Sequence, residues 1–287
     1  MISDENLIKF HEEGFVPGPN ETEKAFLKRI ETTKLFFENP HNYLKDNGLF
    51  DFFDQKASSA YLDWVKIRLK ELFDVNPKYF CYFFKNKKLS FFQAAATWII
   101  EKPDFRLPIV QLKTQLKKKR YLLFYSIDEI LLHEAVHAAR INFDEPNSEE
   151  YFAFSGSSSL IRRTLGPVIK NSKEVWVFFS LIGLGYVSLL LFPGAAVGAF
   201  LLAIMWASLG LFRLFFIRNN LYRAYRKLLK IASSRKLARY ILFRLTDREI
   251  KFFAKKSFKE MIEYIQSEAT SSLRWRVIKL KYLKQFV

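Results

Sequence analysis

The chain has 287 residues, of which 50% are hydrophobic and 17% aromatic, and it carries a net charge of +17. An apolar and aromatic content of this size excludes an intrinsically disordered chain and favours packed helices or contact with a membrane. The single cysteine excludes an internal disulfide.

The first 102 residues are predicted to form a helical N-terminal module. Residues 1–20 contain Gly14, Pro17, Gly18 and Pro19 and are expected to be irregular. Apolar residues recur three and four positions apart over 22–37 and 58–73, which predicts two amphipathic helices. The apolar stretch 90–100 is expected to add a further helix, and no chemistry is predicted for this module.

A change of pattern after residue 102 predicts a small sheet. Segments 108–113 and 121–125 are short runs rich in β-branched or aromatic residues, and the basic turn 115–120 separates them. These two expected strands begin a core at residues 103–168, directly before the most informative stretch of the chain.

That stretch, residues 130–140, contains the pattern His133-Glu134-x-x-His137. On an α-helix residues i and i+4 lie on one face, so the two imidazoles can bind one metal ion. Glu134 is placed beside them as a general base toward an activated water. Residues 130–139 contain no proline or glycine, so an unbroken helix is expected. The alternative is that two histidines fall four residues apart by accident.

These residues resemble the signature of the zincin metallopeptidases, and among them the gluzincins. The metzincin extension requires a glycine and a histidine where this chain has Arg140 and Phe143, which excludes that subclass. The gluzincin resemblance implies a zinc cofactor, hydrolysis of peptide bonds, and a third ligand from a glutamate on the next helix. The third ligand is expected to be a carboxylate, because the other histidines and the cysteine of the chain lie far upstream: His11, His41 and Cys81.

Two adjacent glutamates follow a predicted turn at 143–146, at the start of a second helix that Asn147 or Ser148 is expected to cap. The resemblance favours Glu150 as the ligand, because gluzincin ligands are often followed three residues later by a small residue, here Ala153. Glu149 is the alternative ligand. Both glutamates could instead be favourable charges at a helix N-terminus.

Four further residues are candidates for supporting roles around this site. The aspartate that gluzincins usually carry four residues after the ligand glutamate is replaced by Phe154. Asp128 or Asp144 is therefore expected to orient a metal-bound histidine. Arg140 and Tyr151 are candidates for stabilising the transition state, with a solvated arginine and a packed tyrosine as the alternatives.

Two uncharged stretches predict a transmembrane hairpin within residues 169–217. The expected spans are 175–192 and 195–213, with Pro193-Gly194 as the turn and Arg213 reaching the membrane surface by snorkelling. Basic residues flank both spans while the turn is uncharged, so the positive-inside rule places both termini in the cytoplasm. The alternative is a hydrophobic hairpin buried inside a soluble protein.

The C-terminal region, residues 218–287, is predicted to be helical and strongly basic. It has 19 Lys and Arg against 5 Asp and Glu, a net charge of +14. A capping-box pattern over residues 246–249 predicts a helix that extends to about Ser267. The expected partners of this region are anionic lipid headgroups. Nucleic acid is not an expected partner, because the sequence shows no motif for it.

The predicted fold class is therefore a mainly α integral membrane protein, with a small α+β zincin-like catalytic core and a two-helix transmembrane hairpin. The predicted function is that of a membrane-anchored zinc metallopeptidase acting on cytoplasmic or juxtamembrane protein substrates. Two other classes remain open: a catalytically inactive membrane adaptor with this fold, and a basic protein of the membrane surface or of nucleic acid in which the motif is accidental.

Overall fold

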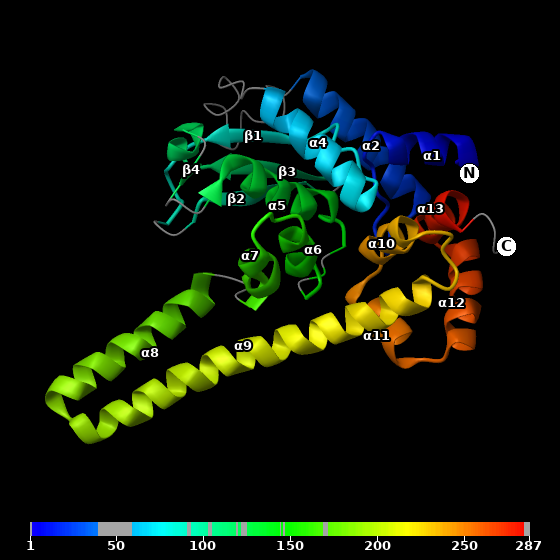
Figure 1. Ribbon diagram of the computed structural model, residues 1–287. Helices are drawn as coiled ribbons and strands as arrows, with labels where there is room; N and C mark the ends of the chain where they lie inside the picture. Colours follow the sequence, from blue (N-terminus) through cyan, green and yellow to red (C-terminus); the bar gives the residue numbers. More distant parts are fainter. Residues whose placement is uncertain are drawn as a thin grey trace.

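A computed structural model shows a mainly helical body with a small sheet, from which two long helices extend as an arm (Figure 1). It describes residues 2–39, 59–90, 93–102, 105–118, 120–121, 125–143, 145, 147–168 and 172–283. Helices from both ends of the chain meet in the body, where the first helix lies beside the last. The mainly α fold with a small sheet confirms the coarse fold class predicted from the sequence.

The N-terminal part contains the helices α1 (Asp4–Glu12), α2 (Glu23–Glu38) and α4 (Ser59–Phe73). The last two confirm the helices predicted at 22–37 and 58–73. The prediction of an irregular segment at 1–20 is wrong over α1, because Ser3 caps this helix by accepting a hydrogen bond from the backbone N–H of Asn6. Leu7 is fully buried in a cluster that includes Val277, near the other end of the chain. Packing against the other end of the chain thus contributes to the stability of this helix.

A sharp turn follows α1 at Gly14. This residue has a φ of 99°, a conformation that favours glycine because a side chain would be strained there. An added Cβ would also lie 1.9 Å from the carbonyl oxygen of Asn76. Glycine at this position is therefore required both by the backbone conformation and by the close approach of the segment that leads into the sheet.

The sheet has the strand order β1-β3-β2. Strand β1 (Cys81–Phe84) is parallel to β3 (Phe105–Leu112), and β2 (Ala95–Lys102) is antiparallel to it. β3 confirms the strand predicted at 108–113. The helix predicted at 90–100 is wrong, because residues from Ala95 onward pair with β3. Ile99 is 52% exposed and Ile100 only 6%, the two-residue alternation of a strand. The sheet therefore joins segments on both sides of the module boundary expected at residue 102.

Short elements connect the sheet to the motif helix. They are η3 (Thr114–Lys118), a single 3₁₀ turn, and the antiparallel strands β4 (Arg120–Tyr121) and β5 (Tyr125–Ser126). Of the strand predicted at 121–125, the described residues show only the two ends. The motif helix α5 (Ile127–Ala139) follows at once, and after it come α6 (Glu149–Ser155), α7 (Leu160–Leu165) and the 3₁₀ turn η4 (Gly166–Val168).

The arm consists of α8 (Ser172–Leu191) and α9 (Pro193–Leu228), and α9 runs from the tip of the arm into the body (Figure 1). Both helices are long and apolar enough to cross a membrane, with mean hydropathies of 1.9 and 2.1. Only 6% and 11% of their most apolar residues are buried, which contradicts the alternative of a hairpin buried inside the protein. The helices are separated at Phe192, one residue before the predicted turn, because Pro193 is well suited to the first turn of α9.

The C-terminal part contains α10 (Arg235–Phe243), α11 (Asp247–Lys255), α12 (Phe258–Ser271) and α13 (Leu273–Tyr282). The helix predicted from residue 246 to Ser267 begins as expected but ends at Lys255. It ends there because Ser257 and Glu260 form a second capping box that starts α12. Glu249 of α11 is buried and accepts hydrogen bonds from Arg274 and Trp275 of α13 at 2.8 and 2.6 Å.

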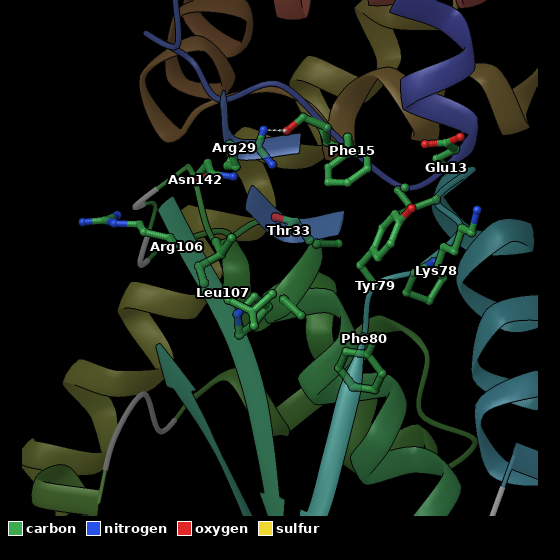
Figure 2. Close-up of a pocket in the computed structure, with 18 residues that line it drawn as sticks. Glu13, Phe15, Arg29, Thr33, Lys78, Tyr79, Phe80, Arg106, Leu107 and Asn142 are labelled. Atoms are coloured by element: carbon green, nitrogen blue, oxygen red, sulfur yellow. Dashed lines mark hydrogen bonds between the residues drawn. The ribbon is translucent and has the colours of Figure 1, made fainter. Parts of the chain in front are cut away.

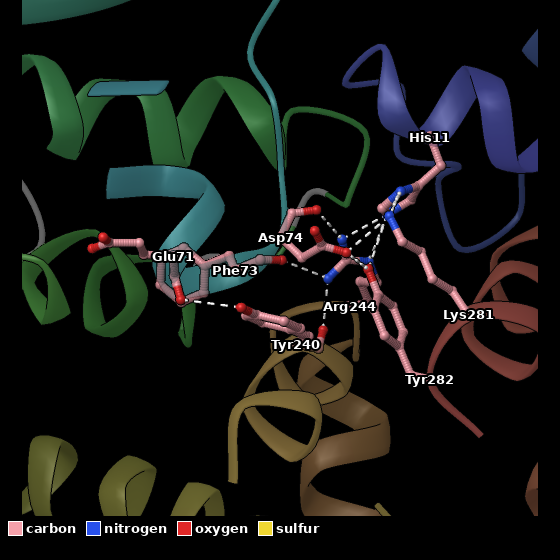
Figure 3. A network of polar contacts seen from close by, with 8 residues as sticks. All are labelled: His11, Glu71, Phe73, Asp74, Tyr240, Arg244, Lys281 and Tyr282. Atoms are coloured by element: carbon pink, nitrogen blue, oxygen red, sulfur yellow. Dashed lines mark hydrogen bonds and ion pairs between the residues drawn. The ribbon is translucent and has the colours of Figure 1, made fainter. Parts of the chain in front are cut away.

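A buried polar network joins the C-terminal helices to the N-terminal part (Figure 3). Arg244, at the end of α10, donates hydrogen bonds to Nε2 of His11 and to two backbone carbonyl oxygens at the end of α4. Tyr282 of α13 donates to the carboxylate of Asp74 at 2.7 Å, and Lys281 forms an ion pair with the same carboxylate at 2.9 Å. Four elements that are far apart in sequence therefore meet around one imidazole.

Stability at mildly acidic pH should depend on His11. Burial, together with the positive charges of Arg244 and Lys281, holds the pKa of His11 well below its ordinary value. The folded protein therefore keeps His11 neutral, while the unfolded chain takes up a proton at about pH 6.5. Stability from this residue is complete above that pH and is lost as the pH falls below it. We expect the loss to approach about 1.4 kcal/mol per pH unit.

The measurement is denaturant unfolding at a series of pH values from about 7.5 to 5, on the parent protein and on His11→Gln. The variant lacks the titrating group, so its unfolding free energy should fall less steeply over this range. Equal slopes for the two proteins would show that His11 is not held neutral in the fold.

Candidate metal centre

The motif helix α5 places His133, Glu134 and His137 on its half-buried face. Ser126 begins the helix by accepting a hydrogen bond from the backbone N–H of Glu129 at 3.4 Å. Apolar side chains of the same helix fill the core of the body and are almost fully buried: Ile127, Ile130, Leu131, Leu132, Ala135 and Val136. Because this apolar face fixes the rotation of the helix, the three motif residues point together toward β2 and α6.

Three atoms suitable as metal ligands converge between α5 and α6. Nε2 of His133 lies 3.2 Å from Nε2 of His137. Oε1 of Glu150 lies 3.4 Å from Nε2 of His137, and Oε2 of the same carboxylate lies 3.6 Å from Nε2 of His133. Zinc bonds of about 2.0–2.1 Å at tetrahedral angles place neighbouring ligand atoms about 3.3–3.4 Å apart. The residues present therefore fit a zinc ion. Three protein ligands with a fourth position left open are typical of catalytic zinc sites.

The two adjacent glutamates of α6 lie on different sides of His137. Glu150 faces Nε2, whereas Oε1 of Glu149 lies 2.9 Å from Nδ1. A carboxylate at the far ring nitrogen fixes the tautomer in which Nε2 is free to bind a metal. The structure thus brings Glu150 together with the two histidines and gives Glu149 the orienting position for which Asp128 or Asp144 was expected.

Burial and neighbouring charges shift the protonation of the two histidines in opposite directions. Burial, helped by the charges of His137 and Arg162, holds the pKa of His133 well below its ordinary value. Burial also acts to lower the pKa of His137, but the hydrogen bond to Glu149 and the charges of the surrounding carboxylates outweigh it and raise this pKa to about 9. His133 is therefore ready to bind a metal as it stands, whereas a metal must compete with a proton at His137.

Glu134 is held by Thr97, a residue that the sequence analysis missed. The hydroxyl of Thr97, on strand β2, donates a hydrogen bond to Oε2 of Glu134 at 2.5 Å. Burial raises the pKa of Glu134, while the charge of His137 and this hydrogen bond act against the rise. A raised pKa suits a carboxylate that must both take up and release a proton near neutral pH. Thr97 was missed because its segment was predicted to be helical, although the β-branched pair Thr97 and Ile99 carried the signal of a strand.

Phe154 stands where gluzincins usually have an aspartate, and it touches the metal centre through its ring. The ring lies edge-on against His133, with ring centres 4.6 Å apart. Gly166 also approaches the ring so closely that an added Cβ would lie 2.4 Å from Cδ1 of Phe154. Aromatic packing therefore holds the ring of His133, in contrast to the carboxylate that holds His137.

Arg140 and Tyr151, the two candidates for the transition state, have other roles in the structure. Arg140 is fully buried and donates hydrogen bonds to the backbone carbonyl oxygens of Phe243 and Leu245. Neither a transition-state role nor the solvated alternative agrees with this position. Tyr151 packs against the core, with the guanidinium of Arg218 6.0 Å from its ring centre. This agrees with the alternative of a packed tyrosine.

Of the two aspartates considered as orienting residues, only Asp128 lies among the described residues. Asp144 lies outside the described residues. Asp128 lies in the first turn of α5, near Tyr82. Burial, with the charges of Tyr61 and Asp128, raises the pKa of Tyr82 to about 12.

The start of α6 is held by a residue from the C-terminal part. Its N-cap, Ser148, makes no capping hydrogen bond through its side chain. The carboxylate of Asp247 instead accepts hydrogen bonds from the backbone N–H groups of Asn147 and Ser148, at 3.0 Å each. No local sequence pattern could have revealed this cap, because Asp247 lies about one hundred residues further along the chain.

A separate small cavity lies near the C-terminal end of α5 (Figure 2). Phe15, Tyr79 and Leu107 are among the residues that line it. Its volume of about 60 Å³ has room for a few water molecules, whereas ligand sites usually have about 300–1,000 Å³. We therefore assign no ligand to it.

Comparisons with protein-family models, with curated proteins and with solved structures found no match to this chain. The chemistry of the site is therefore derived from its own residues and their geometry.

Proposed function

We propose that the protein is a membrane-anchored zinc metallopeptidase that hydrolyses peptide bonds in cytoplasmic or juxtamembrane protein substrates. The observation that carries this proposal is the convergence of His133, His137 and Glu150 at separations of 3.2–3.6 Å, with Glu134 on the same face of α5. In this proposal the first three residues hold zinc and Glu134 is the general base.

When bound, the zinc ion supplies Lewis-acid activation of a water molecule and of the substrate carbonyl. Glu134 accepts a proton from the attacking water and returns it to the leaving amine nitrogen as the peptide bond breaks. Thr97 orients the Glu134 carboxylate through their hydrogen bond. Glu149 holds the ring of His137 so that Nε2 stays directed at the ligand cluster.

Strand β2 offers a place for the substrate beside this site. Among the strands that the structure describes, β2 pairs only with β3, so its other edge has no partner strand. Thr97 of this strand contacts Glu134, which places the edge next to the general base. An extended peptide that paired with the edge would cross the metal centre, as the zincin resemblance also implies.

The arm is proposed to cross the membrane, with both termini in the cytoplasm. Its apolar side chains are largely exposed, which is the state expected of helices that face lipid. The 36 residues of α9 extend about 54 Å, which exceeds the roughly 30 Å of a hydrocarbon core and lets the end of α9 belong to the body. The basic C-terminal part is proposed to contact anionic lipid headgroups.

Zinc binding tests the ligand assignment. We expect about one zinc per chain after purification without added metal. Glu150→Gln should lower the zinc affinity more than Glu149→Gln, because only Glu150 is a ligand. Loss of an orienting partner typically lowers metal affinity by about 10–100-fold, so Glu150→Gln should exceed that range. Competition with a zinc-binding dye measures both affinities, and Glu71→Gln on the exposed surface of α4 is the matched control.

The opposite ranking of the two variants would move the ligand assignment to Glu149. A protein that contains no zinc, and that is indifferent to His133→Ala and His137→Ala, would eliminate the enzyme proposal.

The general-base role of Glu134 has a separate test. Glu134→Gln keeps the size of the side chain and its capacity to accept a hydrogen bond from Thr97 but removes the base. Zinc content and folding should persist, while hydrolysis of a fluorescent casein substrate falls by about 10²–10⁴-fold. Hydrolysis at the parent rate by a zinc-loaded Glu134→Gln protein would show that the mechanism is wrong.

The topology is tested by protease added outside intact cells. Tags fused to the N- and C-termini should remain intact, because both ends are proposed to be cytoplasmic. A tag inserted between Phe192 and Pro193, at the tip of the arm, should be cut and serves as the control. Cleavage of either terminal tag would contradict the orientation.

A further inference from the structure

The short helix α7, at the base of the arm, exposes large apolar side chains. Leu160, Ile161 and Leu165 are 64%, 71% and 52% exposed. At 100° per residue these three positions fall within an arc of about 140°, so they form one face of the helix. A contiguous exposed apolar face beside polar residues is typical of a surface that contacts a partner or a membrane.

Hydrogen bonds fix α7 and η4 at one level of the arm. Arg218 of α9 donates to the backbone carbonyl oxygen of Arg163 in α7 at 3.4 Å. Arg213 of α9 donates to the carbonyl oxygen of Val168 in η4 at 2.6 Å, and it pairs with Glu174 near the start of α8 at 2.7 Å. The helix α7 therefore lies beside the residues of α9 around 213–218, at the base of the arm (Figure 1).

This level corresponds to the surface of the proposed membrane. The uncharged stretch of α9 ends at Phe212. The next residue toward the body, Arg213, forms an ion pair with Glu174 that joins the two arm helices. Phe215 and Phe216, at the same level, are 64% and 55% exposed. Arginine side chains at the ends of apolar spans commonly place their charged groups in the headgroup region.

We infer that α7 is an interfacial helix whose apolar face inserts into the bilayer surface that the arm crosses. This inference rests on the proposed membrane arm and is independent of zinc. Lipid is the partner that fits, because α7 is bonded to the base of the arm and exposes an apolar face there, as α8 and α9 do along their length. The exposed Arg163 beside it is placed to meet anionic headgroups.

Docking of α7 would hold the metal centre at the membrane surface. Glu129 of α5 accepts hydrogen bonds from Ser157 and Ser158, immediately before α7, and from Arg162 within it. At the other end of α7, Gly166 packs on the ring of Phe154, which in turn packs on His133. Both helices of the candidate metal centre are thus in contact with the segment that meets the lipid.

The test measures the depth of single positions by spin labelling of the full chain in vesicles of phosphatidylcholine and phosphatidylglycerol. Cys81, the only cysteine, is first replaced by serine, and Ile161→Cys is then labelled, with Leu165→Cys as a second position on the same face. Ile67→Cys is the matched control, because Ile67 is 63% exposed on α4, which lies on the side of the body away from the arm. Leu202→Cys reports on the arm itself.

At positions 161 and 165 we expect collisions with a water-soluble nickel complex to be several-fold less frequent than at position 67, and collisions with oxygen to be more frequent. Water exposure at 161 and 165 with a lipid-protected position 202 would overturn the inference and leave the arm in place. Water exposure at all three would overturn the arm as well. Protection from both nickel and oxygen would indicate contact with another protein surface and would also overturn the inference. None of these measurements depends on bound zinc, so their outcome does not test the metallopeptidase proposal.

Discussion

Both helices that carry the candidate zinc ligands are fastened to one short segment, residues 243–247. Arg140, at the end of α5, donates hydrogen bonds to the carbonyl oxygens of Phe243 and Leu245, and Asp247 accepts hydrogen bonds from the backbone that starts α6. Between α5 and α6 the described chain forms only turns. The separation of His137 and Glu150 therefore depends on these long-range contacts, because a turn alone does not hold ligand atoms to the few tenths of an ångström that a metal site requires.

The segment 243–247 can anchor the two helices because it is itself buried and hydrogen-bonded to other elements. Arg244 within it binds the carbonyl groups that end α4 and the imidazole of His11, and the capping box of Thr246 and Glu249 starts α11 directly after it. Burial lowers the pKa of Arg140 to about 10, which leaves the guanidinium charged at neutral pH. Removing either anchor would leave buried backbone groups without partners, and each such group costs about 1–3 kcal/mol. The site thus draws its rigidity from both ends of the chain.

The sequence predicted those features that depend on neighbouring residues. The helical spacing of His133 and His137, the helix that follows them, and the long apolar helices of the arm are all local patterns, and the structure contains them. Features decided by distant contacts were missed. The segment of Thr97 is apolar enough for a helix, yet pairing with β3 makes it a strand. The side-chain roles of Arg140 and Asp247 depend on partners about one hundred residues away, so no window of sequence could contain the information.

The donor set and its geometry also bear on which metal the site would select. Two imidazoles and one carboxylate suit zinc, copper, nickel or iron(II), whereas calcium and magnesium prefer oxygen ligands throughout. Square-planar or octahedral coordination with bonds of about 2.0–2.1 Å would bring adjacent ligand atoms to about 2.9 Å, whereas a tetrahedron keeps them about 3.3–3.4 Å apart. The observed separations of 3.2, 3.4 and 3.6 Å, the last two measured to different carboxylate oxygens of Glu150, are closer to the tetrahedral value than to 2.9 Å. Because copper(II) and nickel(II) favour tetragonal geometries and zinc has no such preference, this spacing supports the proposal that the site holds zinc.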